Sequence, residues 1–190
     1  ADAPAFDRTV TRSITVAPDA LPETRRVYTD RDALAESLAD RGYETVTDPT
    51  GADVSVVTDP TAVEGPRLVV PDTDGHLDAG DALQARALPE RESWNLCASF
   101  VHQSLFDALD VVPDQAFNGL YPYEYVTDCR TDDDVAVGYA EGWLANPGAI
   151  VCRRSGADEL AVCTLRVATT YGDHPVGTAV VDRLLATLAE

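Results

Sequence analysis

Four side chains that could ligate a hard cation alternate along one short loop. Asp72, Asp74, His76 and Asp78 lie in the segment PDTDGHLDAG, and carboxylate oxygens are the ligands that Ca²⁺ prefers. The loop lacks the glutamate and the spacing of an EF-hand, and acidic loops are frequent in a chain with 33 Asp and Glu residues. We favour an ordinary solvated loop, keep these four residues as the candidate cation site, and otherwise expect no metal.

An aromatic segment, YPYEY, carries the second group of candidate residues. Tyr121, Tyr123 and Glu124 lie within it, and Trp94 and Trp143 lie on either side of it in the sequence. Large amphipathic rings are enriched where proteins meet other surfaces. We predict that these five residues contact a subunit or a carbohydrate, and we favour docking to a parent enzyme. The alternative is that the rings complete the core where the sheet lacks a helix.

Glu124 also raises the question of glycosidase chemistry. Hydrolysis of a glycosidic bond uses two carboxyl groups held across the sugar, about 5–5.5 Å or about 6.5–9.5 Å apart. Glu124 is the acidic residue whose aromatic surroundings suit stacking on a sugar ring. A stand-alone carbohydrate hydrolase that uses Glu124 and a nearby aspartate is therefore an alternative, although we favour a position at the rim of an interface.

Other signatures of catalysis are absent from the sequence. No G-x-S-x-G or G-x-C-x-G elbow, Walker A loop, G-x-G-x-x-G fingerprint or H-E-x-x-H motif occurs. The cysteines show no C-x-x-C spacing, which argues against a zinc ribbon or a thioredoxin-type site. His102 lies among apolar residues and His174 precedes Pro175 at a helix start, so we expect structural roles for both. We expect no cofactor and assign no catalytic residue.

Strands alternate with helices from about residue 24 onward. Asp30 is predicted to cap a helix over Arg31–Arg41, which Gly42 ends. The rhythm predicts a mainly parallel sheet with helices on both sides, a three-layer flavodoxin-like α/β sandwich. Residues 94–127 are predicted to be largely irregular. The predicted strands are Arg26–Thr29, Tyr43–Thr47, Val54–Val57, Arg67–Val70 and Val135–Tyr139, with short helices at Asp81–Leu88 and Ser104–Leu109.

The C-terminal region predicts an antiparallel hairpin and a closing helix. Ala149–Ser155 pairs with Glu159–Val167, and the helix starts near Pro175, because proline is tolerated in a first helical turn. Cys152 and Cys163 fall roughly opposite each other across the hairpin. They form either a cross-strand disulfide or two buried thiols, and we favour the buried thiols.

The charge of the chain is extreme. Its 190 residues include 33 Asp and Glu against 14 Arg and no Lys, a net charge of −19. Such a protein repels itself in dilute buffer, whereas a Debye length of about 3 Å at 1 M salt removes most of the repulsion. We predict an origin in a high-salt organism, with its cytoplasm favoured over the surrounding brine. The same charge argues against nucleic acid and anionic membranes as partners.

The ends of the chain and its apolar runs suggest how it is organised. No run approaches the roughly 18 apolar residues of a membrane span, and no secretory signal is visible. The chain contains no Met, so we expect a segment of a longer protein. Residues 1–22 are predicted to be an N-terminal arm or extra strand, and residues 23–190 a single domain.

Several segments together resemble a known domain. They are RRVYTDRDALAESLADRGYETVTD, GADVSVVTD with GPRLVV, HQSLFDAL followed by FNGLYPYEY, and the ending ADELAVCTLRVATTYGDHPVGTAVVDRLLATLAE. Over roughly residues 24–190 the chain resembles the class I glutamine amidotransferase-like (flavodoxin-like) domain. That domain occurs as a non-catalytic C-terminal module in some glycoside hydrolases, notably family 2 and beta-galactosidase-type enzymes.

The resemblance implies an ancillary domain of a haloarchaeal glycoside hydrolase, used for packing, oligomerisation or framing of the parent active site. Its partners would be an upstream catalytic domain of the same chain and, in an oligomer, further copies of itself. True amidotransferases of this fold use Cys, His and Glu, and no Cys stands at an elbow here, so no catalytic residue carries over. The alternative is a small-ligand or divalent-cation module at the C-terminal ends of the parallel strands, near Asp30, Asp59 and Asp72 to His76.

Overall fold

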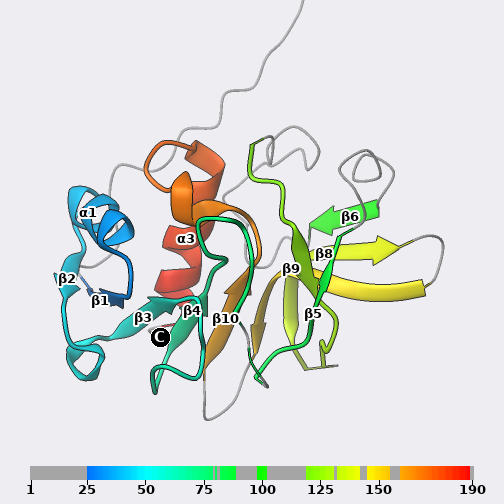
Figure 1. Cartoon of the computed structure of the whole chain (residues 1–190), viewed down its shortest axis with the longest axis horizontal. Coiled ribbons are helices and arrows are strands. Elements are labelled where there is room, and N and C mark those ends of the chain that lie inside the picture. The colour runs from blue at the N-terminus through cyan, green and yellow to red at the C-terminus, as the bar shows by residue number, and fades with distance from the viewer. Residues whose placement is uncertain are drawn as a thin grey trace, which may run out of the picture.

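The computed structural model shows one mixed β-sheet with α-helices packed against its parallel half (Figure 1). It describes residues 25–78, 80, 82–88, 98–101, 119–130, 132–141, 145–154 and 159–188. The α/β class predicted from the sequence is confirmed. The predicted arm over residues 1–22 and the predicted helix at Ser104–Leu109 lie outside the described residues.

Five parallel strands follow the strand order of flavodoxin-like folds. The order is β2-β1-β3-β4-β10, in which the chain starts inside the sheet, moves to one edge and then returns past its first strand. β3 is buried at every position, as expected for a strand that is covered on both faces. The strands are β1 (Arg26–Thr29), β2 (Glu44–Val46), β3 (Val54–Val57), β4 (Arg67–Val69) and β10 (Leu160–Cys163).

Two α-helices, α1 (Asp32–Asp40) and α3 (Pro175–Leu188), share one apolar core on the same face of this parallel half (Figure 1). α1 ends at Asp40 with Arg41 as its C-cap, and Gly42 follows at the predicted position just beyond the helix, with a φ of +99° that suits glycine. α3 begins near the predicted Pro175, and its apolar residues Val176, Val180, Leu184, Leu185 and Leu188 are buried. Among the helices of the described residues, none is long and apolar enough to cross a bilayer.

The predicted N-cap of α1 is wrong. The cap position belongs to Arg31 rather than Asp30, and the Arg31 side chain makes no capping bond. The backbone of Arg31 is extended, with φ −130° and ψ 118°, so the helix begins at Asp32, one residue later than predicted. The Arg31 side chain instead crosses the ends of two neighbouring strands, where it donates hydrogen bonds to Thr58 and Pro71.

A buried polar cluster joins the end of α1 to α3. The carboxylate of Asp182 accepts hydrogen bonds from Arg41 Nη2 at 2.7 Å, from the Tyr171 hydroxyl at 2.6 Å and from the Tyr43 hydroxyl at 3.1 Å. Burial, together with the negative charge of Asp182, raises the pKa of both tyrosines above its ordinary value. Both hydroxyls therefore stay protonated and act as donors.

The rest of the sheet is antiparallel and more extensive than one hairpin. β9 (Ala145–Arg154) pairs with β10 and with β8 (Asp134–Glu141), which confirms the pairing of the predicted hairpin, although β10 ends at Cys163 and the predicted strand extended to Val167. The residues between β9 and β10 at the hairpin turn lie outside the described part of the chain. The remaining strands are β5 (Ala85–Ala87), β6 (Ala98–Val101) and β7 (Glu124–Val126).

Two predictions for the middle of the chain are wrong. Where a helix was predicted over Asp81–Leu88, the structure has strand β5, which pairs antiparallel with β7. The region predicted to be irregular, residues 94–127, contains β6 and β7. The reason is physical: β5 is exposed at every position, so no alternation of apolar residues marks it as a strand.

A second, smaller core lies on the opposite face of the sheet. Val69, Val162 and Cys152 from the strands pack there with Leu83. Cys152 pairs with Val162 and Cys163 pairs with Val151, so the two thiols are one position out of register and point to opposite faces. Both are free and buried, which confirms the favoured prediction of two buried thiols.

Candidate functional site

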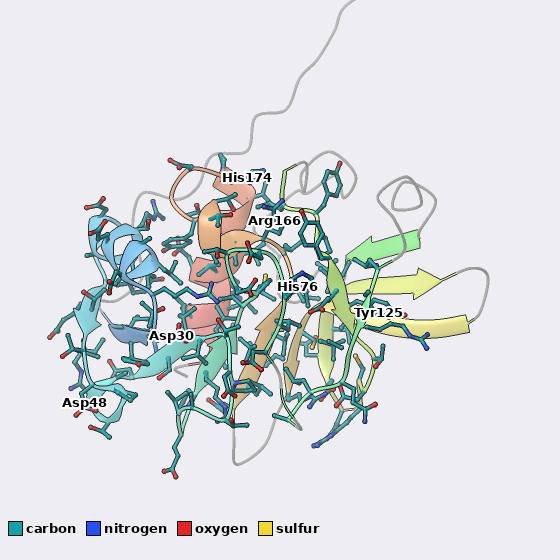
Figure 2. All side chains as sticks on the ribbon, in the orientation of Figure 1. Asp30, Asp48, His76, Tyr125, Arg166 and His174 are labelled. Carbon is teal, nitrogen blue, oxygen red and sulfur yellow. The ribbon has the colours of Figure 1, made fainter. Side chains whose placement is uncertain are left out.

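The loops after β4 and β10 meet at one exposed aromatic ring. β4 and β10 are parallel neighbours, so their C-terminal ends lie side by side. Gly75 and His76 come from the loop after β4, and Arg166 follows β10 by three residues. All three residues approach Tyr123, which precedes β7. Figure 2 shows His76 and Arg166 between the parallel and antiparallel parts of the sheet.

Tyr123 combines exposure with a fixed position. Its 44% exposure makes it the exposed large hydrophobic side chain of the described residues. The Arg166 guanidinium lies over its ring, 5.1 Å from the centroid, and Arg166 Nη1 donates to the Tyr123 hydroxyl at 3.2 Å. The Tyr123 carbonyl oxygen accepts a hydrogen bond from the Leu88 amide at 2.8 Å. Tyr123 is therefore held both at its backbone carbonyl and at its side-chain hydroxyl.

Gly75 makes the close packing of this ring possible. A Cβ atom built at Gly75 would lie 2.5 Å from Cδ2 of Tyr123, which is closer than nonbonded carbons approach. Gly75 also has φ +94°, a left-handed conformation that L side chains rarely adopt. The His76 ring follows at 6.1 Å between centroids, tilted by 43°. The turn is closed by Asp72, whose carboxylate accepts the His76 amide at 2.8 Å.

Glu124 is held by the same loop. Its Oε2 accepts the Leu77 amide at 2.8 Å, and its Oε1 lies 3.4 Å from Nδ1 of His76. Both carboxylate oxygens are thus engaged within the chain. We name the exposed region formed by His76, Tyr123, Glu124 and Arg166 the Tyr123 surface.

A groove of about 920 Å³ borders the Tyr123 surface. It is lined by strand β5 and the loop before it, and by the paired strand β7 and the residues after it. Its lining is mostly polar and includes Asp78, Gln84, Arg86, Glu124, Thr127 and Cys129, with Leu77 and Leu83 from the second core. Glu124 therefore belongs both to the Tyr123 surface and to the groove.

At the C-terminal ends of β1 and β3 a guanidinium fills the space between the loops. Arg31 Nη1 donates to the Pro71 carbonyl oxygen at 2.7 Å, and its other terminal nitrogen donates to the Thr58 hydroxyl. Burial lowers the pKa of Arg31, and the nearby carboxylate of Asp30, at 3.8 Å, opposes this shift. In flavodoxin-like sheets, ligands usually bind beyond the C-terminal ends of β1 and β3, the switch point at which the strand order reverses. Here a side chain of the chain itself occupies it.

The acidic loop does not gather its side chains around a common point. The Asp72 carboxylate bonds its own turn, Asp74 and Asp78 are exposed, and His76 faces Glu124. Within the described residues, no three His, Cys, Asp or Glu side chains are grouped closely enough to hold a metal ion. Asp59 likewise bonds within its own turn, to the amide and hydroxyl of Thr61.

The remaining predicted residues divide into described and undescribed ones. Tyr121 is half-buried beside Tyr123 in the sequence. Trp94, Trp143 and His102 lie outside the described residues. His174 has the structural role expected of it, because its Nδ1 accepts the Gly177 amide at 3.2 Å in the first turn of α3.

Three arginines of the described chain were not anticipated by sequence reasoning. Arg31 fills the switch point, Arg166 holds Tyr123, and Arg154 is 6% exposed and forms ion pairs with Asp128 at 2.8 Å and Asp133 at 3.5 Å. An arginine in an acidic chain normally indicates an ion pair at the surface, so nothing in the sequence indicated that these side chains would hold the fold together.

Comparison with known proteins adds little to this geometry. No protein-family model matches the sequence, and no curated protein matches it. Among solved structures, the chain is similar to a GMP synthase-type protein from Thermoplasma acidophilum. The two are 10% identical, with 88% of this chain and 95% of that chain covered and a TM-score of 0.48. We draw no functional conclusion from a likeness this distant.

Proposed function

We propose that this chain is a non-catalytic ancillary domain of a haloarchaeal glycoside hydrolase, and that it contacts the upstream catalytic domain of the same chain through the Tyr123 surface. One observation carries the proposal: the Tyr123 ring is 44% exposed and yet held by residues from three separate segments. A ring that is already fixed loses little conformational entropy when a partner covers it. Such rigid aromatic anchors are typical of protein contact surfaces.

The neighbours of Tyr123 support contact with a protein. Arg166 and Glu124 place opposite charges beside one aromatic ring, and arginine and tyrosine are the residue types that dominate interface energetics. His76 adds a ring whose side chain is 62% exposed. A partner with its own mixture of apolar and charged groups would complement this surface.

The filled switch point supports a scaffold role. Arg31 occupies the position where flavodoxin-like sheets usually hold a ligand, and Asp59 and Asp72 use their carboxylates to stabilise their own turns. These polar groups serve the fold. The exposed and positioned groups lie instead at the Tyr123 surface.

The test begins with the complete reading frame that contains this chain. We expect a glycoside hydrolase domain upstream, and its absence would reject the proposal. In that full-length protein, Tyr123→Ala should increase the rate at which a protease cuts between the domains, because it removes the contact ring. Glu44→Ala, on the edge strand β2, is the matched control and should leave the rate unchanged. Equal rates for both variants would also argue against the Tyr123 surface as the contact.

A second candidate is a small-ligand module that uses the groove. The observation in its favour is that Glu124, with both oxygens positioned, shares a groove of about 920 Å³ with Arg86 and Gln84. Calorimetry with saccharides, nucleotides and Ca²⁺ in molar KCl tests it. Binding that is lost in Glu124→Gln would favour this candidate, and no heat of binding would reject it.

A stand-alone carbohydrate hydrolase is the third candidate. Glu124 and Asp78 line the same groove, so two carboxyl groups are present there. This candidate requires turnover of a glycoside by the isolated chain, and the turnover must disappear in Glu124→Gln. An inactive isolated chain rejects it.

A further inference from the structure

Two cysteines from different segments meet at the groove. Cys129 follows β7 by three residues and lines the groove, while Cys152 lies in β9 and is 1% exposed. Cys129 packs against the apolar cluster that contains Cys152, and its Sγ donates to the Val126 carbonyl oxygen at 3.8 Å. One cysteine of the pair therefore lines the groove, and the other is buried in the adjoining core.

The backbone around Cys129 is held in place from both sides. Arg154 Nη2 donates to the Asp128 carbonyl oxygen at 3.2 Å and forms an ion pair with the Asp128 carboxylate at 2.8 Å. On the other side, the Arg130 amide donates to Oδ2 of Asp133 at 2.7 Å. Arg154 belongs to the same strand as Cys152, so its bonds to Asp128 tie the segment that contains Cys129 to that strand.

The two thiols have opposite chemical character. The hydrogen bond with Cys152 lowers the pKa of Cys129, with a further lowering from Arg154, while burial and the carboxylates of Asp133 and Asp128 act against it. The same hydrogen bond and burial raise the pKa of Cys152. Cys129 lines the groove whereas Cys152 is 1% exposed, so Cys129 is the thiol that a reagent in the groove reaches first.

We propose that Cys129 and Cys152 form an oxidisable dithiol, in which Cys129 reacts with a hydroperoxide that enters the groove and Cys152 closes a disulfide. The Cys129 thiolate attacks one peroxide oxygen, the O–O bond breaks, and Cys129 becomes a sulfenic acid as hydroxide leaves. The Cys152 sulfur then attacks the Cys129 sulfur, an S–S bond forms and water leaves. With hydrogen peroxide, two thiols lose two electrons and two protons in total, and the peroxide is reduced to two waters.

The disulfide would tie the segment after β7 to β9. That segment forms a wall of the groove through Thr127 and Cys129, so the oxidised protein would hold this wall more rigidly. The inference does not depend on the proposed function, because neither cysteine belongs to the Tyr123 surface.

The chain provides a matched control in Cys163. Cys163 is also a buried strand thiol, 0% exposed, but it points to the opposite face of the sheet, and burial raises its pKa to about 12. Cys97 is replaced by serine throughout, because trypsin leaves Cys97 and Cys129 in one peptide, residues 92–130. Of the four cysteines, this leaves Cys129, Cys152 and Cys163 to be counted.

The experiment treats the folded Cys97→Ser protein in molar KCl with hydrogen peroxide, then counts thiols after denaturation. We expect two of the three thiols to disappear and the mass to fall by two hydrogens, with peptide 92–130 joined to peptide 131–153. Adding Cys163→Ala should leave this result unchanged. Adding Cys152→Ala should stop the reaction at a sulfenic acid on Cys129, which dimedone traps.

Three results would overturn the proposal. They are retention of all three thiols, a disulfide that includes Cys163, and equal peroxide reactivity after Cys129→Ala. Circular dichroism of each variant before treatment checks that it is folded. Should Cys152→Ala not fold, Cys129→Ser, at the partly exposed position, still decides the matter, since it must abolish oxidation of Cys152.

Discussion

Tyr123 and Asp182 show two different uses of tyrosine and carboxylate chemistry. Tyr123 presents its ring to solvent while Arg166 restrains the hydroxyl. At Asp182 the tyrosines are buried instead of exposed: a carboxylate that is 7% exposed accepts hydrogen bonds from the hydroxyls of Tyr43 and Tyr171. The first arrangement is suited to contact with a partner, and the second to holding α1 against α3.

Removing the Asp182 carboxylate should destabilise the protein strongly. Asp182→Ala leaves Arg41 without its ion pair and two buried hydroxyls without an acceptor, so we expect the free energy of unfolding to fall by about 3 kcal/mol. Asp53→Ala breaks the solvent-exposed pair with Arg26 and is the control, with a much smaller effect expected. Urea unfolding in molar KCl measures both, and equal effects would show that the cluster does not stabilise the fold.

The tyrosines of this cluster also predict a pH dependence. The pKa of Tyr171 is raised in the folded state above its ordinary value of about 10, so above that pH the unfolded chain loses the proton first. The contribution of Tyr171 to the free energy of unfolding is therefore fully present below about pH 10 and is lost as the pH rises above it. Tyr171→Phe should reduce the slope by about 0.7 kcal/mol per pH unit at pH 10 and by about 1.4 kcal/mol per pH unit above pH 11. An unchanged slope in urea unfolding would contradict this reading of the cluster.

Sequence reasoning at the residue scale found exposed groups and missed buried charged ones. Tyr123 and Glu124 stand in an aromatic segment that is visible in the sequence. Arg31 and Arg154 were missed because their partners lie 40 and 72 residues away at backbone carbonyls, which any sequence could provide. The contact of Cys129 with Cys152 was missed for a similar reason: it depends on where the segment after β7 crosses β9.

At the scale of elements, parallel pairing of β4 with β10 creates the Tyr123 surface. The pairing places the ends of two strands side by side although they are about 90 residues apart in the chain, at Val69 and Val162. The loops that follow then meet, one with Gly75 and His76 and the other with Arg166. Strand β7 delivers Tyr123 and Glu124 to the same place.

Gly75→Ala should displace the Tyr123 ring. The new Cβ would come within 2.5 Å of Tyr123 Cδ2, and the positive φ adds a cost of about 1–2 kcal/mol. Gly65→Ala is the matched control, since Gly65 also has a positive φ, +83°, but no atom within 4 Å of the added Cβ. Near-ultraviolet circular dichroism should change in Gly75→Ala and not in Gly65→Ala. Identical spectra would show that Tyr123 does not depend on this contact.

The elements with strong apolar patterns were predicted, and the short exposed ones were not. In the sequence, α3 is marked by apolar residues at helical spacing, and β3 by a continuous apolar run. β5 consists of Ala-Arg-Ala and is exposed throughout, so its strand conformation comes from pairing with β7 rather than from its own sequence. The N-cap of α1 is Arg31 and not the predicted Asp30, because the tertiary hydrogen bonds of Arg31 override the local preference for aspartate at a cap.

At the scale of the whole molecule, charge dominates the behaviour in solution. A net charge of −19 on 190 residues creates repulsion that opposes the folded state unless salt screens it. The apolar cores do not depend on that screening, since their side chains are buried on both faces of the sheet. Stability should therefore respond to salt through the surface alone.

The melting temperature should rise steeply with KCl at low concentration. Between 0.1 M and 1 M the Debye length falls from about 10 Å to about 3 Å, and we expect a rise of roughly 10 °C for a chain of this size. Above 1 M the rise should become shallow, because the charges are already screened. Thermal unfolding followed by circular dichroism measures the curve, and a flat or falling one would contradict adaptation of this surface to high salt.

The most direct test of the account compares glycosidase activity of this chain with that of the full-length protein from its complete reading frame. Both are assayed on a panel of chromogenic aryl glycosides in molar KCl. We predict hydrolysis by the full-length protein and none by the 190-residue chain alone. Hydrolysis by the chain alone, abolished by Glu124→Gln, would contradict the role of an ancillary domain and identify the groove as an active site.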